Sequence, residues 1–259
     1  MKTVLTIAGS DPSGGAGIQA DLKTIAAHGL YGMSAITALT AQNTTGVYGV
    51  MEVPPDFLAS QLDCIFTDIF PDSIKIGMVS NYKAMETIAG KLEEYGAQNI
   101  VMDPVMVSTS GRRLMDGNAQ ETLLSKLFPL AAVVTPNLPE TEALCGFPIQ
   151  DISGMEKAAE KIGKQTGASV LVKGGHLTGK AVDVLWHDGT IKQFWSERVQ
   201  NPNTHGTGCT LSSAIACNLA LGLPLEESVQ RAKDYLTAAL KAMLDLGKGN
   251  GPLDHTYRI

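Results

Sequence analysis

The sequence predicts an α/β fold with a mainly parallel central sheet, and three observations support this prediction. Short apolar runs typical of buried strands alternate with longer segments whose apolar residues recur every three or four positions, as in helices. Polar or glycine-rich residues follow most of the apolar runs, as is typical of the carboxyl ends of parallel strands. Two further short strands, at residues 182–186 and 191–194, are joined by a turn and predict a hairpin at the edge of the sheet.

The first half of the chain predicts four strands and one small edge strand or flap. Residues 4–8 predict a strand, and the glycine-rich loop 9–17 leads into a helix that stops at Gly29. Weak alternation at residues 48–53 predicts a small edge strand or flap, and a helix begins at Pro55. The other expected elements are strands at 33–41, 73–77 and 100–102 and a helix at 82–95.

The second half continues the alternation. Helices are expected at residues 119–127 and 154–166, and a strand follows each of them, at 132–135 and 169–173. After the hairpin, a turn centred on Gly206 opens into a helix of small residues, and a last helix is expected at 226–246. No linker, repeat or low-complexity tract interrupts this order, so residues 1–259 are expected to form one domain.

Composition excludes several classes of partner. The net charge is −6, the isoelectric point is near 5.4 and no basic run occurs, so neither nucleic acid nor an anionic membrane is an expected partner. No apolar stretch approaches the length of a membrane span, and the short apolar start does not predict a signal peptide. The four cysteines show neither C-x-x-C pairing nor zinc-finger spacing, which favours reduced thiols and a cytoplasmic location.

The turn at residues 203–209 is the most informative segment. The first N–H groups of a helix have no partner inside it, and Gly206 and Gly208 carry no Cβ that would keep an oxyanion away from them. Cys209 lies in the first turn of the helix, where the pKa of a thiol can fall below its usual value of about 8.5. The turn predicts a phosphate or transition-state anion site beside a reactive thiol; an ordinary glycine-containing helix start is the alternative.

Polar side chains also follow several predicted strands. Gln42 and Asp103 each come directly after an apolar run, Asn137 and Glu140 follow another, and Lys173 ends a fourth. Glu140 has an alternative role in capping a helix, and Lys173 in snorkelling at the surface. Two carboxylates, a lysine and an anion-binding helix start together predict Mg²⁺-dependent phosphoryl transfer.

The glycines at the end of loop 9–17 resemble a dinucleotide-binding fingerprint. The segment from Gly15 to Ala20 matches the dinucleotide fingerprint G-x-G-x-x-A, but the loop is too long and no acidic residue follows about 20 positions later. A dinucleotide oxidoreductase is therefore disfavoured. Asp21, in the first turns of the next helix, is expected either to contact a polar small molecule or to complement the helix N-terminus.

Four ordered motifs carry a resemblance to a known family. They are residues 8–24, Asp103-Pro104-Val105-Met106, residues 135–140, and residues 205–210. With them, nearly the whole chain resembles the hydroxymethylpyrimidine/phosphomethylpyrimidine kinases of thiamine biosynthesis, in the ribokinase-like superfamily. The resemblance implies a three-layer α/β/α fold, a homodimer, and two ATP-dependent steps. The first phosphorylates 4-amino-5-hydroxymethyl-2-methylpyrimidine, and the second converts the monophosphate into the diphosphate.

The resemblance also implies site roles. Asn137, Lys173 and Thr207 would bind ATP; Glu140 and Asp103 would serve the metal; Gly206, Gly208 and Cys209 would be catalytic; Gly9, Asp21, Gln42 and Met78 would border the pyrimidine. Most ribokinase-like enzymes carry an aspartate base where this chain has Cys209. A thiol with an unperturbed pKa is mostly protonated at neutral pH, and the helix start is expected to lower that pKa. We hypothesise that Cys209 accepts the proton of the substrate hydroxyl group.

Two alternatives remain beside this interpretation. Pyridoxal kinase is the main competitor, alone or as a dual activity, although the Gln42 amide both donates and accepts and so suits an aminopyrimidine edge. A non-catalytic ligand sensor on the same fold is the other, and it would require a broken motif, which the sequence does not show.

Overall fold

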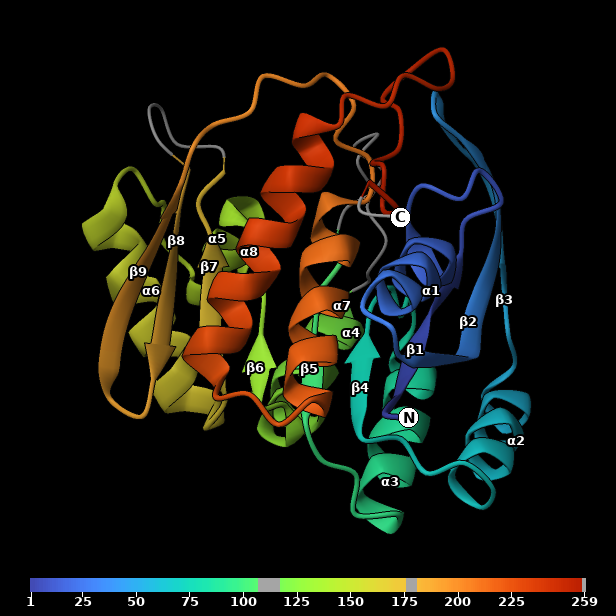
Figure 1. The fold of residues 1–259 in the computed structure, drawn as a ribbon. Helices are drawn as coiled ribbons and strands as arrows, with labels where there is room; N and C mark the ends of the chain where they lie inside the picture. Colours follow the sequence, from blue (N-terminus) through green and yellow to red (C-terminus); the bar gives the residue numbers. More distant parts are fainter. Residues whose placement is uncertain (107–116, 176–180, 258–259) are drawn as a thin grey trace.

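The computed structural model describes residues 1–106, 117–175 and 181–257, and it contains a nine-stranded sheet (Figure 1). The strand order across this sheet is β3-β2-β1-β4-β5-β6-β7-β8-β9. The strands are β1 (Thr3–Ser10), β2 (Tyr31–Asn43), β3 (Gly46–Glu52), β4 (Ser73–Ile76), β5 (Ile100–Met102), β6 (Val133–Val134), β7 (Ser169–Lys173), β8 (Ala181–His187) and β9 (Thr190–Ser196).

Strand direction confirms the predicted sheet. The six strands from β2 to β7 in this order run parallel, while β3 pairs antiparallel with β2 at one edge. The β8–β9 hairpin pairs antiparallel with β7 at the other edge. Because the carboxyl ends of all six parallel strands meet at one edge of the sheet, the residues that follow them are brought together.

Helices cover both faces of the sheet, which gives the expected three layers (Figure 1). Successive strand residues point to opposite faces, so Val101 joins one core while Ile100 and Met102 join the other. The first core includes residues of α7 (Thr207–Ala220) and α8 (Leu225–Lys241), and α1 (Gly17–Ala27) packs on α7. The second core contains residues of α2 (Pro55–Phe66), α3 (Tyr82–Glu94), α4 (Gly117–Thr122), α5 (Leu138–Cys145) and α6 (Ile152–Thr166).

Three predicted boundaries were wrong, and each has a local reason. The helix expected at 119–127 is split into α4, a π-helical turn η1 (Leu123–Leu127) and a 3-10 turn η2 (Phe128–Leu130) that contains a proline. Strand β2 continues to Asn43 because its last residues pair with β3. Helix α8 ends at Lys241, five residues early, because Met243 adopts a left-handed backbone with φ 54°.

The chain beyond α8 returns to the loop that precedes α7. The Asn203 side chain donates to Leu244 O at 2.9 Å and accepts from the Gly251 amide at 2.9 Å. The His205 amide donates to Gly251 O at 3.1 Å. The C-terminal segment therefore holds the start of α7 in place. Within the described ranges, no helix is long and apolar enough to cross a membrane.

Candidate active site

The start of α7 has the backbone that the glycine pattern predicts. Gly206 is left-handed with φ 86°, and a Cβ there would collide with Gly15 O, so glycine is required twice over. The first hydrogen bond of the helix runs from the Thr210 amide to Gly206 O at 2.8 Å. The amides of Gly208 and Cys209 precede it, which leaves them at the positive end of the helix dipole.

An ion pair from two strand ends faces this turn. Lys173 Nζ lies 2.7 Å from Asp103 Oδ1, and the Thr135 hydroxyl donates to the same oxygen at 3.1 Å. A Cβ on Gly208 would lie 3.2 Å from Asp103 Oδ2 and 3.4 Å from Lys173 Nζ. The missing side chain therefore lets the helix start approach a lysine and a carboxylate, which is the arrangement expected of a phosphate site.

Charges around Lys173 keep it protonated. Burial alone would lower the pKa of its ammonium group, but the carboxylates of Asp103 and Glu140 outweigh burial and raise this pKa. Lys173 is therefore a permanent cation at neutral pH, anchored at the end of β7 rather than extended along the surface.

Asn137 and Glu140 form the capping box at the start of α5. The Asn137 side chain accepts from the Glu140 amide at 2.9 Å, and Glu140 Oε2 accepts from the Asn137 amide at 2.8 Å. The capping role is thus confirmed. Burial raises the pKa of the Glu140 carboxyl to about 7, against the opposing effect of Lys173 and with a further increase from Asp103.

The donor set next to Lys173 suits a magnesium ion that arrives with a nucleotide. Among the described residues, no group of three or more histidine, cysteine or acidic side chains could hold a metal by itself. Magnesium in nucleotide sites usually takes one or two carboxylates, with waters and substrate phosphates completing its shell. Asp103 and Glu140 supply two carboxylates, and a cation beside them would favour the ionised form of Glu140.

Three of the residues expected at the pyrimidine lie on neighbouring strands. Gly9 is in β1, Gln42 is near the end of β2 and Met78 follows β4. A Cβ on Gly9 would lie 3.0 Å from Met78 Cε, and Gln42 Nε2 lies 3.2 Å from His205 Nε2, next to the α7 turn. The fold therefore brings these three residues to the same edge of the sheet as the predicted phosphate site.

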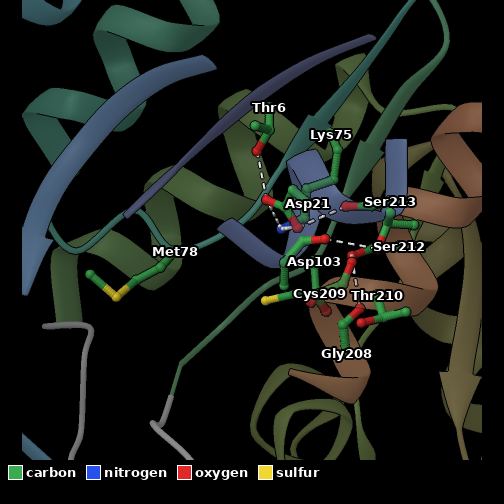
Figure 2. Close-up of polar contacts among 12 residues, drawn as sticks. Thr6, Asp21, Lys75, Met78, Asp103, Gly208, Cys209, Thr210, Ser212 and Ser213 are labelled. Carbon is green, nitrogen blue, oxygen red and sulfur yellow. Dashed lines mark hydrogen bonds and ion pairs between the residues drawn. The ribbon is translucent and has the colours of Figure 1, made fainter. Parts of the chain in front are cut away.

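Asp21 does not lie at the surface of this edge, and because it is beyond the first turn of α1 the expected role at the helix N-terminus was wrong. Its side chain is 0% exposed, and its carboxylate accepts from Lys75 Nζ at 2.8 and 2.9 Å. Thr6 and Ser213 donate to it at 2.6 and 2.7 Å (Figure 2). Asp21 is thus half of a buried ion pair, and its burial does not favour the expected contact with a small molecule. The missed partner had one sequence signal, a lysine inside the short apolar strand β4.

The expected lowering of the Cys209 pKa was also wrong. Burial raises the pKa of this thiol to about 11; the Lys75 cation and the Gly17 amide oppose the increase, and the Asp21 and Asp103 carboxylates add to it. Figure 2 shows the thiol pointing toward the side on which Met78 lies. The position of the cysteine at the helix start is as predicted, but the helix dipole is outweighed by its surroundings.

Comparison with known proteins places this geometry in a family. Residues 11–254 match the family described as phosphomethylpyrimidine kinase. The chain belongs to this family. A thiamine biosynthesis bifunctional protein from Geobacter sulfurreducens is 51% identical over 98% of this chain, which spans only 52% of that protein. A hydroxymethylpyrimidine/phosphomethylpyrimidine kinase from Rhizobium meliloti is 48% identical, over 98% of this chain and 97% of its own length.

Solved structures confirm the ribokinase-like fold. A phosphomethylpyrimidine kinase from Clostridium difficile matches with a TM-score of 0.83 and 45% identity, over 92% of this chain and 99% of its own. The Staphylococcus aureus pyridoxal kinase in complex with ADP matches with a TM-score of 0.93 and 37% identity, over 100% of this chain and 96% of its own. The chain is therefore a kinase family member and not a dinucleotide oxidoreductase.

We predict that Asp21→Asn lowers the free energy of unfolding by about 3–5 kcal/mol, because it leaves the Lys75 ammonium group buried without a counter-ion. Urea unfolding at neutral pH measures this. The double variant Asp21→Leu/Lys75→Met should recover much of the loss, since it removes both charges. Glu227→Gln, which breaks the exposed Glu227–Arg231 pair, is the control and should change stability by roughly 0.5 kcal/mol or less. A stable Asp21→Asn protein with a greatly increased KM would instead indicate ligand contact.

Proposed function

We propose that this chain is an ATP-dependent kinase acting on 4-amino-5-hydroxymethyl-2-methylpyrimidine and then on its monophosphate. The observation that carries the proposal is the approach of the Gly208 backbone to the Asp103–Lys173 pair, in a member of this family. Phosphoryl transfer depends mainly on positioning the reactants and on neutralising phosphate charge. The start of α7 and the Asp103–Lys173 ion pair together suit both tasks.

Each group at the site has a role in this proposal. The amides at Gly206 and Gly208 stabilise the negative charge that develops on the transferred phosphate, and Lys173 neutralises the nucleotide phosphates. The Thr207 amide donates to Thr204 O at 3.2 Å, so it would exchange this partner for a phosphate oxygen of ATP. Asp103 and Glu140 orient magnesium, which supplies charge neutralisation when bound. Asn137 holds Glu140 in place through the capping box and lies beside the nucleotide. Gly9, Met78 and Gln42 border the pyrimidine.

Pyridoxal phosphorylation is the second candidate activity. It is favoured by the close match to a Staphylococcus aureus pyridoxal kinase solved with AMP-PCP and pyridoxal, with a TM-score of 0.91 and 36% identity. The pyrimidine remains the primary substrate in our proposal for two reasons. Relatives at 44% and 48% identity are named hydroxymethylpyrimidine/phosphomethylpyrimidine kinases, and one at 51% is named a thiamine biosynthesis bifunctional protein. In addition, Gln42 suits an aminopyrimidine edge.

We also propose a cytoplasmic, single-domain enzyme that forms a homodimer. All four cysteines are free thiols, which suits a reducing compartment. The exposed side chains of Leu39, Tyr48 and Met51 gather on β2 and the edge strand β3, a surface that a second copy would cover. Sedimentation equilibrium is expected to give twice the mass of one chain, which is 27.3 kDa. A single species with the mass of one chain would contradict the dimer.

The substrate proposal predicts magnesium-dependent ADP release with the pyrimidine alcohol and with its monophosphate, in a coupled assay that also offers pyridoxal. Gln42→Met should reduce kcat/KM for the pyrimidine roughly tenfold more than for pyridoxal, because methionine neither donates nor accepts a hydrogen bond to the ring edge. Gln193→Met, at an exposed position of β9, is the control and should change neither value. An equal loss on both substrates would remove Gln42 from ring recognition.

For Cys209, we propose that the thiolate accepts the proton of the substrate hydroxyl group. Because the thiol pKa is raised to about 11, the thiolate fraction grows with pH throughout the range below that value. We therefore expect kcat to rise up to about tenfold per pH unit between pH 7 and 9, and Cys209→Ala to flatten this profile with a loss of more than tenfold. A Cys209→Ala enzyme within tenfold of wild type, with the same profile, would mean that the cysteine only packs against the substrate.

A further inference from the structure

Three side chains from separate segments meet beside the predicted ring site. Asp11 lies in the loop after β1, Gln42 lies near the end of β2, and His205 precedes the α7 turn. His205 Nε2 lies 2.8 Å from Asp11 Oδ2 and 3.2 Å from Gln42 Nε2. Asp11 and His205 are 2% and 6% exposed, so water does not mediate or replace these contacts easily.

Asp11 acts only as a hydrogen-bond acceptor. Its Oδ1 accepts from the Ser13 amide at 2.9 Å and the Ser13 hydroxyl at 2.7 Å, and its Oδ2 accepts from the Ala16 amide at 2.9 Å. Burial would raise the pKa of the carboxyl, but these donors and His205 outweigh it and lower this pKa to about 2. The carboxylate is ionised at neutral pH, so the proton of the Asp11–His205 contact must belong to His205 Nε2.

That assignment creates a conflict at Gln42. One ring nitrogen carries one proton, and His205 Nε2 gives it to Asp11. The nitrogen then has no lone pair in the ring plane with which to accept from the Gln42 NH₂ group, so two donors face each other at 3.2 Å. Gln42 is half-buried, and the donor–donor contact is unfavourable because neither N–H group has an acceptor in the other.

Thr40 shows a second conflict at the other end of the amide. Its hydroxyl group donates its single proton to Ser10 O at 2.9 Å. Gln42 Oε1 lies farther away, at 3.3 Å from the Thr40 oxygen, so it competes with Ser10 O for that one proton and has the weaker contact. A half-turn of the carboxamide relieves both conflicts: Oε1 then shares the His205 Nε2 proton with Asp11 in a three-centre hydrogen bond, at 3.2 Å against 2.8 Å, and the NH₂ group donates to Thr40 Oγ1.

We infer that Asp11 and His205 are positioning residues that fix the Gln42 carboxamide, with its oxygen on the His205 side and its NH₂ group on the Thr40 side. This inference rests on the proposed pyrimidine activity for its consequence but not for its geometry. The amide keeps one further lone pair and one further N–H for a ligand, in a fixed order.

The fixed order determines which way round the substrate binds. An aminopyrimidine presents its 4-amino donor next to its ring N3 acceptor, and a carboxamide pairs with both at once. The 4-amino group must therefore lie on the Oε1 side, toward His205. The 5-hydroxymethyl group is adjacent to the 4-amino group on the ring, so it too points toward the His205–Cys209 turn, where the phosphate is transferred. A reversed amide would direct it away from this turn.

Nuclear magnetic resonance of the ¹⁵N-labelled full chain tests the geometry without any substrate. We expect His205 Nε2 to be protonated, and the Gln42 NH₂ protons to show nuclear Overhauser effects to the Thr40 side chain. An unprotonated Nε2, or Overhauser effects from the NH₂ protons to the His205 ring instead, would overturn the inference.

Enzyme kinetics test the consequence. The measurement is the ratio of kcat/KM for the pyrimidine alcohol to that for its analogue without the 4-amino group. His205→Leu should lower this preference about tenfold, because the Gln42 oxygen is no longer held toward the amino group. His205→Gln retains an N–H donor toward Asp11 and Gln42 and should restore most of the preference.

His28→Gln replaces a histidine at the far end of α1, beside Tyr235, and is the matched control; it should leave the preference unchanged. If His205→Leu lost activity but kept the preference, the positioning role would be overturned, because general damage to the fold lowers kcat/KM for both substrates alike. If the wild-type enzyme phosphorylated neither pyrimidine, the proposed function would fail, while the resonance measurement would still decide the orientation of the amide.

Discussion

The buried ion pair between Asp21 and Lys75 is the interaction on which the rest of the site depends. It joins α1 to β4, and through Thr6 and Ser213 it also reaches β1 and α7. A charge in such a place is tolerated only if its partner and its hydrogen bonds are all present, so these four elements can assemble in one register only. Since the glycine turn proposed to bind phosphate begins α7, the position of that turn relative to the sheet depends on a buried contact between side chains (Figure 2).

Beside the start of α7, the site is organised by one lysine and two neighbouring carboxyl groups. Lys173 is held by Asp103. Burial raises the pKa of the nearby Glu140 carboxyl to about 7, with Lys173 opposing the increase and Asp103 adding to it. The positive and negative charges of this cluster nearly cancel, so it can accept a phosphate and a metal ion together with little change in net charge. The glycines make this possible, because a side chain at Gly208 would stand between the helix start and the Asp103–Lys173 pair.

The sequence was informative wherever the signal was local. Periodicity located the strands, the position of glycine located the start of α7, and the strand ends located Asp103, Glu140 and Lys173. Properties that depend on contacts between distant segments could not be predicted. Asp21 and Lys75 are 54 positions apart, and Asp11 and His205 are 194 apart. The prediction of a lowered Cys209 pKa was wrong for the same reason. A helix start can be predicted from the sequence, but the burial of the thiol and the carboxylates around it cannot.

In the proposed function, different residues recognise the ring and transfer the phosphate, and His205 links the two groups. The residues proposed for transfer lie on α7, β7 and the end of β5, and phosphoryl transfer places few demands on which alcohol receives the phosphate. The residues proposed for ring contact lie on β2, on β1 and in the segment after β4. Among kinases of this fold, which include a structurally similar pyridoxal kinase, the substrate ring can therefore differ while the residues around the phosphate stay the same. His205 is the exception, because its side chain contacts Gln42 while its backbone leads directly into Gly206. A substitution there alters both the orientation of the ring and the approach to the turn, so the choice of substrate is constrained most strongly at this residue.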